Sequence, residues 1–199
     1  MPRGREFDDS EVVDAAKEEF WDRGYPGTSI SDIERRTGLK RSSLYLAYGS
    51  KRGLFENALS RYQDDFVTDK LRVMEGGPAE LASVAGFFSL LLEYFLEDPA
   101  HAQRGCLIVN SIAELGGRDD DTTAAGAEFR DRLEAAFRRS LEGAAAAGEV
   151  ESSTVERRAR VLAAATFGVW LSARIDARNA ADLCGEITAE VESWRITPA

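Results

Sequence analysis

The sequence has few of the residues on which metal sites, disulfide frameworks and acid–base catalysis depend. It contains two cysteines and one histidine among 199 residues. Cys106 and Cys184 stand far apart along the chain and give no disulfide framework and no paired metal-ligand spacing. No Ser-His-Asp set can form without His101, and no glycine-rich phosphate-binding motif occurs. We therefore expect no metal, no cofactor and no enzymatic activity.

Long apolar runs are also missing. The first residues lack the apolar stretch of a signal peptide, and Ser89 and Glu93 interrupt the most apolar segment, 84–96. These observations predict a protein without a membrane span that resides in a reducing cytoplasm. No strand-like run of Val, Ile and Thr occurs, and prolines number five. The composition therefore predicts an all-α fold.

Apolar residues recur at helical spacing through most of the chain. We expect helices at about 9–22, 29–37, 40–45, 51–74, 79–96, 104–115, 122–147, 155–178 and 181–194. Ser29 and Asp32 have the spacing of a helix-capping box, and Gly76-Gly77-Pro78 is the clearest break. We predict an N-terminal three-helix domain at 1–50 and a C-terminal helical domain at 51–199.

The net charge of −10 is unevenly distributed. Residues 1–62 contain 11 Lys or Arg and 11 Asp or Glu, so the remainder carries the whole negative charge. Within 30–61 there are seven basic and three acidic residues. Because salt screens fields beyond about 8–10 Å, such a local basic patch can attract phosphates on an acidic protein.

Two short helices joined through Gly38, with basic and hydroxyl residues opening the second, are typical of a helix-turn-helix. This motif places the first residues of its second helix against base edges in the major groove. Those residues are Lys40, Arg41, Ser42 and Ser43. The residues that flank this surface and can hold phosphates are Thr28, Tyr45 and Lys51.

The stretch from Thr28 to Phe55, TSISDIERRTGLKRSSLYLAYGSKRGLF, resembles the DNA-binding domain of the TetR family of repressors. The resemblance covers about 9–62. It implies a homodimer, a palindromic operator in double-stranded DNA, and an effector that releases the DNA. By position, it implies phosphate contacts for Thr28, Ser43, Tyr45 and Lys51, and base contacts for Lys40, Arg41 and Ser42.

The sequence departs from the family pattern at two positions near the end of the recognition helix. Ala47 stands where the family often has His or Tyr, so one backbone contact is missing from the pattern. Tyr48 stands where the family usually has a buried Phe. We expect Leu44 and Tyr48 to belong to the core.

Aromatic residues at helical spacings give the C-terminal part a large apolar interior, which is either ordinary core or a small-molecule pocket. The resemblance places an effector pocket between residues 60 and 175. The residues expected to line it are Phe66, Phe88, Leu91, Phe95, Asn110, Glu114, Phe129, Phe167 and Trp170. Asn110 and Glu114, one turn apart, are either polar anchors in this pocket or a solvated face.

Cys106 offers an alternative way of sensing. The segment from Gly105 to Asn110 resembles one in a branch of TetR-type regulators, some of which use a cysteine to sense electrophiles or oxidants. A helix N-terminus and Arg104 would favour the reactive thiolate. The other interpretation is a small buried thiol that packs like alanine. A thiol sensor acting through Cys106 is therefore the alternative to a ligand-controlled repressor.

The last two predicted helices combine small and large apolar residues. Small residues let helices approach closely, and large ones fill the seam. Two such helices from each subunit would form a four-helix dimer interface, as the resemblance implies. Two-fold symmetry would then place the recognition helices about 34–36 Å apart, or farther if the half-sites are farther apart.

Overall fold

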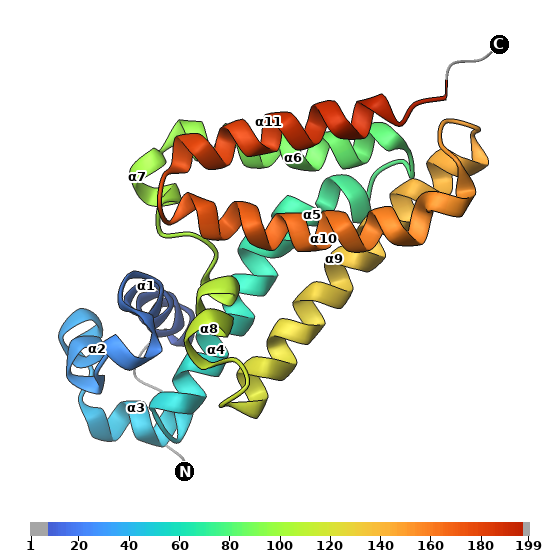
Figure 1. The fold of residues 1–199 in the computed structure, drawn as a ribbon. Coiled ribbons are helices and arrows are strands. Elements are labelled where there is room, and N and C mark those ends of the chain that lie inside the picture. Colours follow the sequence, from blue (N-terminus) through green and yellow to red (C-terminus); the bar gives the residue numbers. More distant parts are fainter. Residues whose placement is uncertain (1–7, 197–199) are drawn as a thin grey trace. The chain divides into compact units, whose positions relative to one another are not determined.

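The computed structural model describes residues 8–196, which are helical almost throughout and contain no strand (Figure 1). The chain divides into two compact units, the first ending at Val67 and the second beginning at Thr68. The first unit contains α1 (Asp9–Gly27), α2 (Ile30–Thr37), α3 (Arg41–Tyr48), α4 (Lys51–Tyr62) and a π-helical turn (Gln63–Val67). The predicted all-α fold is confirmed.

The second unit contains the remaining helices. They are α5 (Thr68–Glu75), α6 (Leu81–Glu97), α7 (Pro99–Ala102), α8 (Leu107–Leu115), α9 (Asp120–Ala146), a 3₁₀ turn (Ser152–Thr154), α10 (Val155–Ala173) and α11 (Ala177–Ser193). Among the described residues, no helix combines the length and apolar character that crossing a membrane requires.

The core of the first unit forms between α1 and α4. The rings of Phe20 and Phe55 meet edge to face with centroids 5.0 Å apart, and Trp21 meets Tyr62 at the same distance. Such edge-to-face pairs stabilise beyond the area that they bury. Leu44 of α3 is also buried, as expected. This aromatic core supports the two short helices α2 and α3.

Glycines set the breaks around the short helices. Gly24 has a φ of 71° and breaks α1 two residues after its predicted end at 22. Gly38 has a φ of 72°, ends α2 and turns the chain toward α3. A residue with a Cβ rarely adopts this left-handed conformation, so glycine suits both positions.

Three features of this unit differ from the sequence expectation. The helix predicted at 51–74 is divided by the π-helical turn, and α3 continues to Tyr48 instead of ending at Tyr45. α4, which we placed at the start of the second domain, packs on α1 within the first unit. The structural division thus falls after Val67, whereas the sequence suggested 50.

In the second unit, α11 lies along α6, and α10 packs against α9 (Figure 1). Phe87 and Phe88 of α6 meet Phe137 of α9 in the interior. Gly143 is required where α9 approaches the segment before α6, because a Cβ there would lie 1.9 Å from the Ala79 carbonyl oxygen. The short helix α7 was not predicted, and α8 begins at 107 instead of 104.

Candidate DNA-binding site

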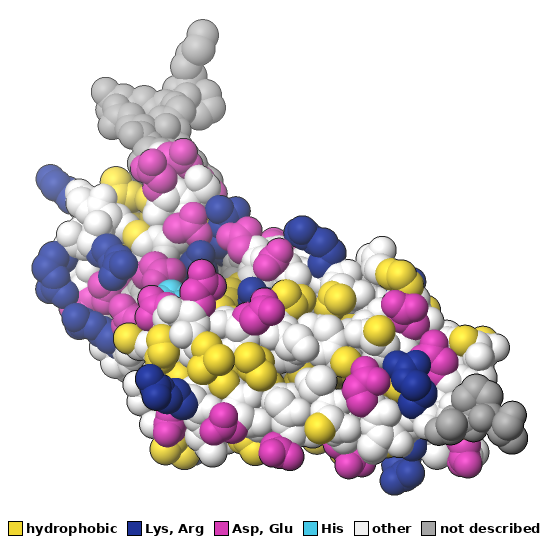
Figure 2. Space-filling view, turned by 90° about the horizontal axis from the view of Figure 1, so that it is seen from above, with side chains coloured by type: hydrophobic (Ala, Val, Ile, Leu, Met, Phe, Trp, Pro, Cys, Tyr) yellow, Lys and Arg dark blue, Asp and Glu magenta, His cyan; other side chains and the backbone are white. Residues whose placement is uncertain are grey.

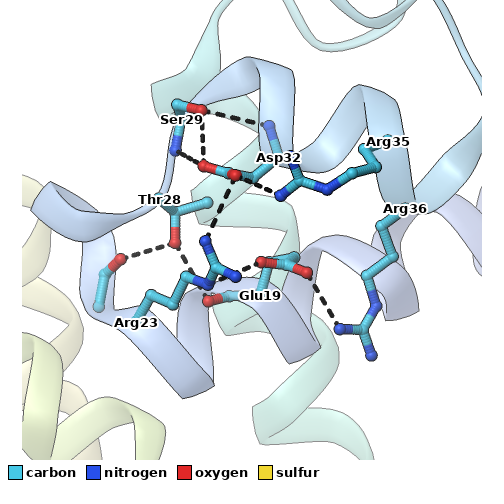
Figure 3. Close-up of polar contacts among 8 residues, drawn as sticks. Glu19, Arg23, Thr28, Ser29, Asp32, Arg35 and Arg36 are labelled. Atoms are coloured by element: carbon cyan, nitrogen blue, oxygen red, sulfur yellow. Dashed lines mark hydrogen bonds and ion pairs between the residues drawn. The ribbon is translucent and has the colours of Figure 1, made fainter.

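The start of α2 is fixed by a capping box. The Asp32 backbone N–H donates to Ser29 Oγ at 3.2 Å, and the Ser29 N–H donates to Asp32 Oδ2 at 2.9 Å. Arg23 and Arg35 also pair with Asp32 (Figure 3). Hydrogen bonds from Ser29, followed by that from Arg35, hold the Asp32 pKa well below its usual range. The Asp32 carboxylate thus connects the start of α2 to Arg23 of α1 and to Arg35 within α2.

The Thr28 side chain is buried and forms hydrogen bonds within the first unit. Its side chain is 1% exposed, and its hydroxyl donates to the carbonyl oxygens of Gly24 at 2.8 Å and Glu19 at 3.1 Å (Figure 3). A hydroxyl has a single proton to donate. In this structure the single proton is shared between these two carbonyl oxygens and joins α1 to the turn before α2, and the expected phosphate contact of Thr28 stays a prediction.

Four side chains form the exposed face of α3, which we call the reading face. They are Arg41, Ser42, Tyr45 and Leu46. Spacings of three and four residues make neighbours of Ser42 and Tyr45, of Arg41 and Tyr45, and of Ser42 and Leu46 on the helix surface. The Arg41 guanidinium carbon lies 5.6 Å from the centre of the Tyr45 ring. Lys40, the exposed residue just before α3, extends this face, whereas Ser43 is half-buried.

Sequence reasoning missed Leu46 because it considered only side chains that can form hydrogen bonds. Leu46 is 90% exposed. The signal that could have found it is its position four residues after Ser42, which the helical period places on the same side of α3.

Glu34 fixes the start of the recognition helix and was also missed. Lys40, at the N-cap of α3, makes no side-chain capping hydrogen bond. Instead, the Arg41 backbone N–H donates to Glu34 Oε1 across the turn, at 2.6 Å. A carboxylate at a helix N-terminus also interacts favourably with the helix dipole. The Glu34 carboxylate therefore joins α2 directly to α3.

Lys51 opens α4 beside Tyr25. Its Nζ donates to the Tyr25 backbone carbonyl oxygen at 2.5 Å and lies 4.1 Å from the centre of the Tyr25 ring. Partial burial lowers the Lys51 pKa. An ammonium has three donors, so this contact holds the group in place and leaves donors for a phosphate.

Tyr48, expected in the core, is half-buried, and its hydroxyl donates to Asp9 Oδ1 at 2.7 Å.

The residues predicted to line an effector pocket fall into separate aromatic clusters. In the second unit, Phe88 stacks on Phe137, Phe95 meets Trp170 with centroids 5.1 Å apart, and Phe129 meets Phe167 at 5.5 Å. Leu91 of α6 is fully buried. Phe66 lies in the first unit instead, where its ring stacks on Tyr62.

A hollow of about 380 Å³ adjoins one of these clusters. Its lining residues are Ile112, Gly116, Gly117, Thr123, Gly126, Ala127, Arg130 and Phe167. Asn110, on the same helix as Ile112, is 6% exposed and donates from Nδ2 to the Arg104 carbonyl oxygen at 2.8 Å. Among the described residues its buried Oδ1 has no hydrogen-bond partner. Glu114 is half-buried.

One side of α10 and the residues just after it is apolar and exposed. Its members, which we call the α10 stripe, are Val161, Ala164, Gly168, Leu171 and Ile175. Figure 2 shows hydrophobic side chains lying among charged ones along the second unit. A Cβ added to Gly168 would meet nothing within 4 Å. The glycine therefore leaves open space that a close neighbour can occupy.

Comparison with known proteins identifies this arrangement. Residues 12–58 match the family described as bacterial regulatory proteins, tetR family, and residues 81–187 match the tetracyclin repressor-like C-terminal domain. The chain belongs to the TetR family. The first match covers the α1–α4 region that carries the reading face, and the second covers most of α6–α11. Membership makes the chain a DNA-binding transcription regulator of a homodimeric family with small-molecule effectors.

Individual relatives agree with this assignment. The chain is 30% identical to the uncharacterized HTH-type transcriptional regulator YezE of Bacillus subtilis, over 89% of this chain and 91% of YezE. It is 29% identical to the Escherichia coli repressor ComR, over 60% of this chain and 56% of ComR. A solved structure of the TetR-family regulator CifR, a cysteine mutant bound to 26-bp operator DNA, is similar with a TM-score of 0.77. That similarity has 28% identity and covers 95% of this chain and 98% of CifR.

Proposed function

We propose that the chain is a cytoplasmic repressor that binds a palindromic operator as a homodimer and releases it when a small apolar effector binds. The exposed reading face of α3 carries this proposal. A guanidinium, a hydroxyl and a phenol share one side of a helix whose opposite side is anchored by buried Leu44. Guanidinium and hydroxyl groups are donors that recognise base edges in the major groove.

Charges around α3 favour the approach of a phosphate backbone. Lys40 and Arg41 are exposed at its N-terminus, and Lys51 lies at the N-terminus of α4. Contacts of this kind fix the register of the protein on the duplex, while base contacts select the sequence.

The α10 stripe supports a symmetric dimer as the means of reading a palindrome. Ala164 and Gly168 would let two α10 helices approach closely, while Val161, Leu171 and Ile175 would fill the seam. A two-fold axis through such a seam presents the same reading face twice. Two identical reading faces related by two-fold symmetry bind two inverted half-sites, and a site with two inverted half-sites is a palindromic operator.

An apolar interior beside an unsatisfied amide oxygen of Asn110 supports an apolar effector. The aromatic clusters of α6, α9 and α10 provide the apolar surface, and Asn110 Oδ1 provides a buried acceptor. A ligand with an N–H or O–H group would satisfy this acceptor. If the effector binds one conformation of the dimer better than the DNA-bound one, DNA affinity must fall by the same factor.

Selection of bound sites from random double-stranded DNA tests the proposal. We expect an enriched palindrome whose half-site centres lie one helical turn apart, about 34–36 Å, or a larger spacing. Arg41→Ala should abolish enrichment at one position of each half-site, whereas Arg72→Ala, which truncates an exposed arginine of α5, should leave the selected sequence unchanged. Enrichment of no sequence, or of a site without two-fold symmetry, would contradict the proposal.

The effector part of the proposal needs a separate assay. The selected operator, labelled and bound to the protein, can be challenged with a library of small apolar compounds while fluorescence anisotropy reports release. We expect at least one class of compound to release the DNA. Asn110→Leu should weaken that release while leaving operator affinity unchanged. If the same compound releases the wild-type protein and Asn110→Leu equally well, the Asn110 side chain is no part of the effector site.

A thiol sensor is the second candidate, and the position of Cys106 favours it. Cys106 is the N-cap residue of α8, and its backbone carbonyl accepts from Asn110. The structurally similar regulator CifR was solved on its operator with cysteines substituted. Burial raises the pKa of the other thiol, Cys184, to about 12, which disfavours its thiolate. Cys184 therefore serves as the control for Cys106 in a test of thiol sensing.

Treatment of the operator complex with N-ethylmaleimide or hydrogen peroxide distinguishes the two candidates. If Cys106 is the sensor, either reagent releases the DNA, Cys106→Ala abolishes the response, and Cys184→Ala retains it. The side chain of Cys106 is 1% exposed, so the thiol must become accessible for this reaction to occur. A complex that both reagents leave intact, but that an apolar compound dissociates, would reject the thiol sensor.

A further inference from the structure

The reading face contains one side chain that forms no hydrogen bonds. At 90% exposure, Leu46 is the most exposed large hydrophobic side chain among residues 8–196. It lies on the same side of α3 as Arg41, Ser42 and Tyr45, opposite the buried Leu44. A single exposed leucine elsewhere on a protein surface needs no explanation. On a surface that enters a DNA groove, the isobutyl group must be accommodated by the DNA.

The chemistry of the major groove offers one suitable partner. Its edges carry mainly hydrogen-bond donors and acceptors, and the one bulky apolar group among them is the C5-methyl of thymine. A leucine pressed against a donor or acceptor would strip water from that group without replacing its hydrogen bond. Contact with a thymine methyl instead removes two apolar surfaces from water.

We propose that Leu46 determines operator specificity by contacting the C5-methyl group of a thymine in each half-site. This inference rests on the proposed binding of a palindromic operator. Helix geometry also predicts where the thymine lies. Leu46 follows Ser42 by one helical turn, which corresponds to about 6 Å along α3. Base pairs are spaced by about 3.4 Å, so the thymine lies within about two base-pair steps of the base that Ser42 contacts.

Replacing thymine with deoxyuridine in the selected operator tests the inference. Deoxyuridine keeps the hydrogen-bonding groups and charge of thymine and lacks only the methyl group. Each thymine is replaced singly, and the dissociation constant is measured for the wild-type protein and for Leu46→Ala. Because Leu46 is exposed, its truncation should leave the fold intact, which circular dichroism and thermal unfolding can verify.

We expect one thymine per half-site at which deoxyuridine weakens wild-type binding about fourfold, the effect of burying one methyl group. Replacement in both half-sites should weaken it about sixteenfold if the two effects add. Leu46→Ala should bind the thymine and deoxyuridine duplexes equally. The control Leu96→Ala, which truncates a leucine of α6 that is 52% exposed, should discriminate like the wild type.

Two results would overturn the inference while leaving DNA binding established. One is wild-type affinity that is unchanged by deoxyuridine at every position. The other is a Leu46→Ala variant that discriminates thymine from deoxyuridine as strongly as the wild type does. A selection that recovers no palindromic site would instead reject the proposed operator binding, and this inference with it. The two failures are therefore distinguishable.

Discussion

Gly168 is a position where one methyl group should change folding and dimerisation in opposite directions. It lies in the interior of α10, and a Cβ there meets no atom of its own chain within 4 Å. Alanine in an exposed helix interior is favoured over glycine by about 1 kcal/mol. Gly168→Ala should therefore raise the free energy of unfolding of each chain by about 1 kcal/mol.

The same methyl group should weaken the dimer if the α10 stripe forms the seam. Adding a methyl to a close-packed contact costs about 1–3 kcal/mol. The dissociation constant of the dimer should then rise about 5- to 150-fold. Urea unfolding at low protein concentration measures the first effect, and sedimentation equilibrium measures the second.

Ala124→Gly, at an exposed position of α9, provides the mirror-image control. It should lower the free energy of unfolding by about 1 kcal/mol and leave the dimer unchanged. A Gly168→Ala protein that is more stable but dimerises as tightly as the wild type would refute the assignment of the α10 stripe to the seam. A less stable monomer would refute the reasoning that Gly168 faces open space.

Three further predictions concern the first unit. Ser29→Ala removes a helix cap and should lower the free energy of unfolding by about 1 kcal/mol in urea. Asp32 has a lowered pKa, so its stabilisation is present above its unfolded value of 3.8 and is lost as pH falls below it; Asp32→Asn should make the urea midpoint of unfolding less dependent on pH between about pH 4 and 2. Lys51→Ala should weaken binding to all DNA sequences and reduce the salt slope by about one unit, whereas Arg41→Ala should cost about 1–3 kcal/mol at one base-pair position; equal effects on every sequence would reject these roles.

The sequence predicted the helices well where local signals mark their ends. The capping spacing of Ser29 and Asp32 and the glycine after Thr37 place α2 almost to the residue, because both act within one turn. The division of the 51–74 segment by a π-helical turn left no such mark. Apolar residues continue through Gln63–Val67 at nearly helical spacing, so the change in hydrogen bonding is invisible to periodicity.

The candidate site was predicted by residue type, and the structure adds the burial of each predicted side chain. Arg41, Ser42 and Tyr45 lie together at the surface because a helical period of 3.6 residues requires it. Thr28 matched the family pattern by position, yet its hydroxyl is satisfied by two carbonyl groups inside the unit. The bond from Arg41 to Glu34 spans seven residues and a turn, so no local propensity indicates it.

That bond gives residue 34 an influence on DNA recognition from outside the contact surface. The angle at which α3 leaves the turn depends on a carboxylate of the preceding helix that accepts the first backbone N–H of α3. A mutation there would tilt every side chain of the reading face together without changing any of them. Relatives of this protein could thus acquire new operators through a change at this one position, with an unaltered recognition helix.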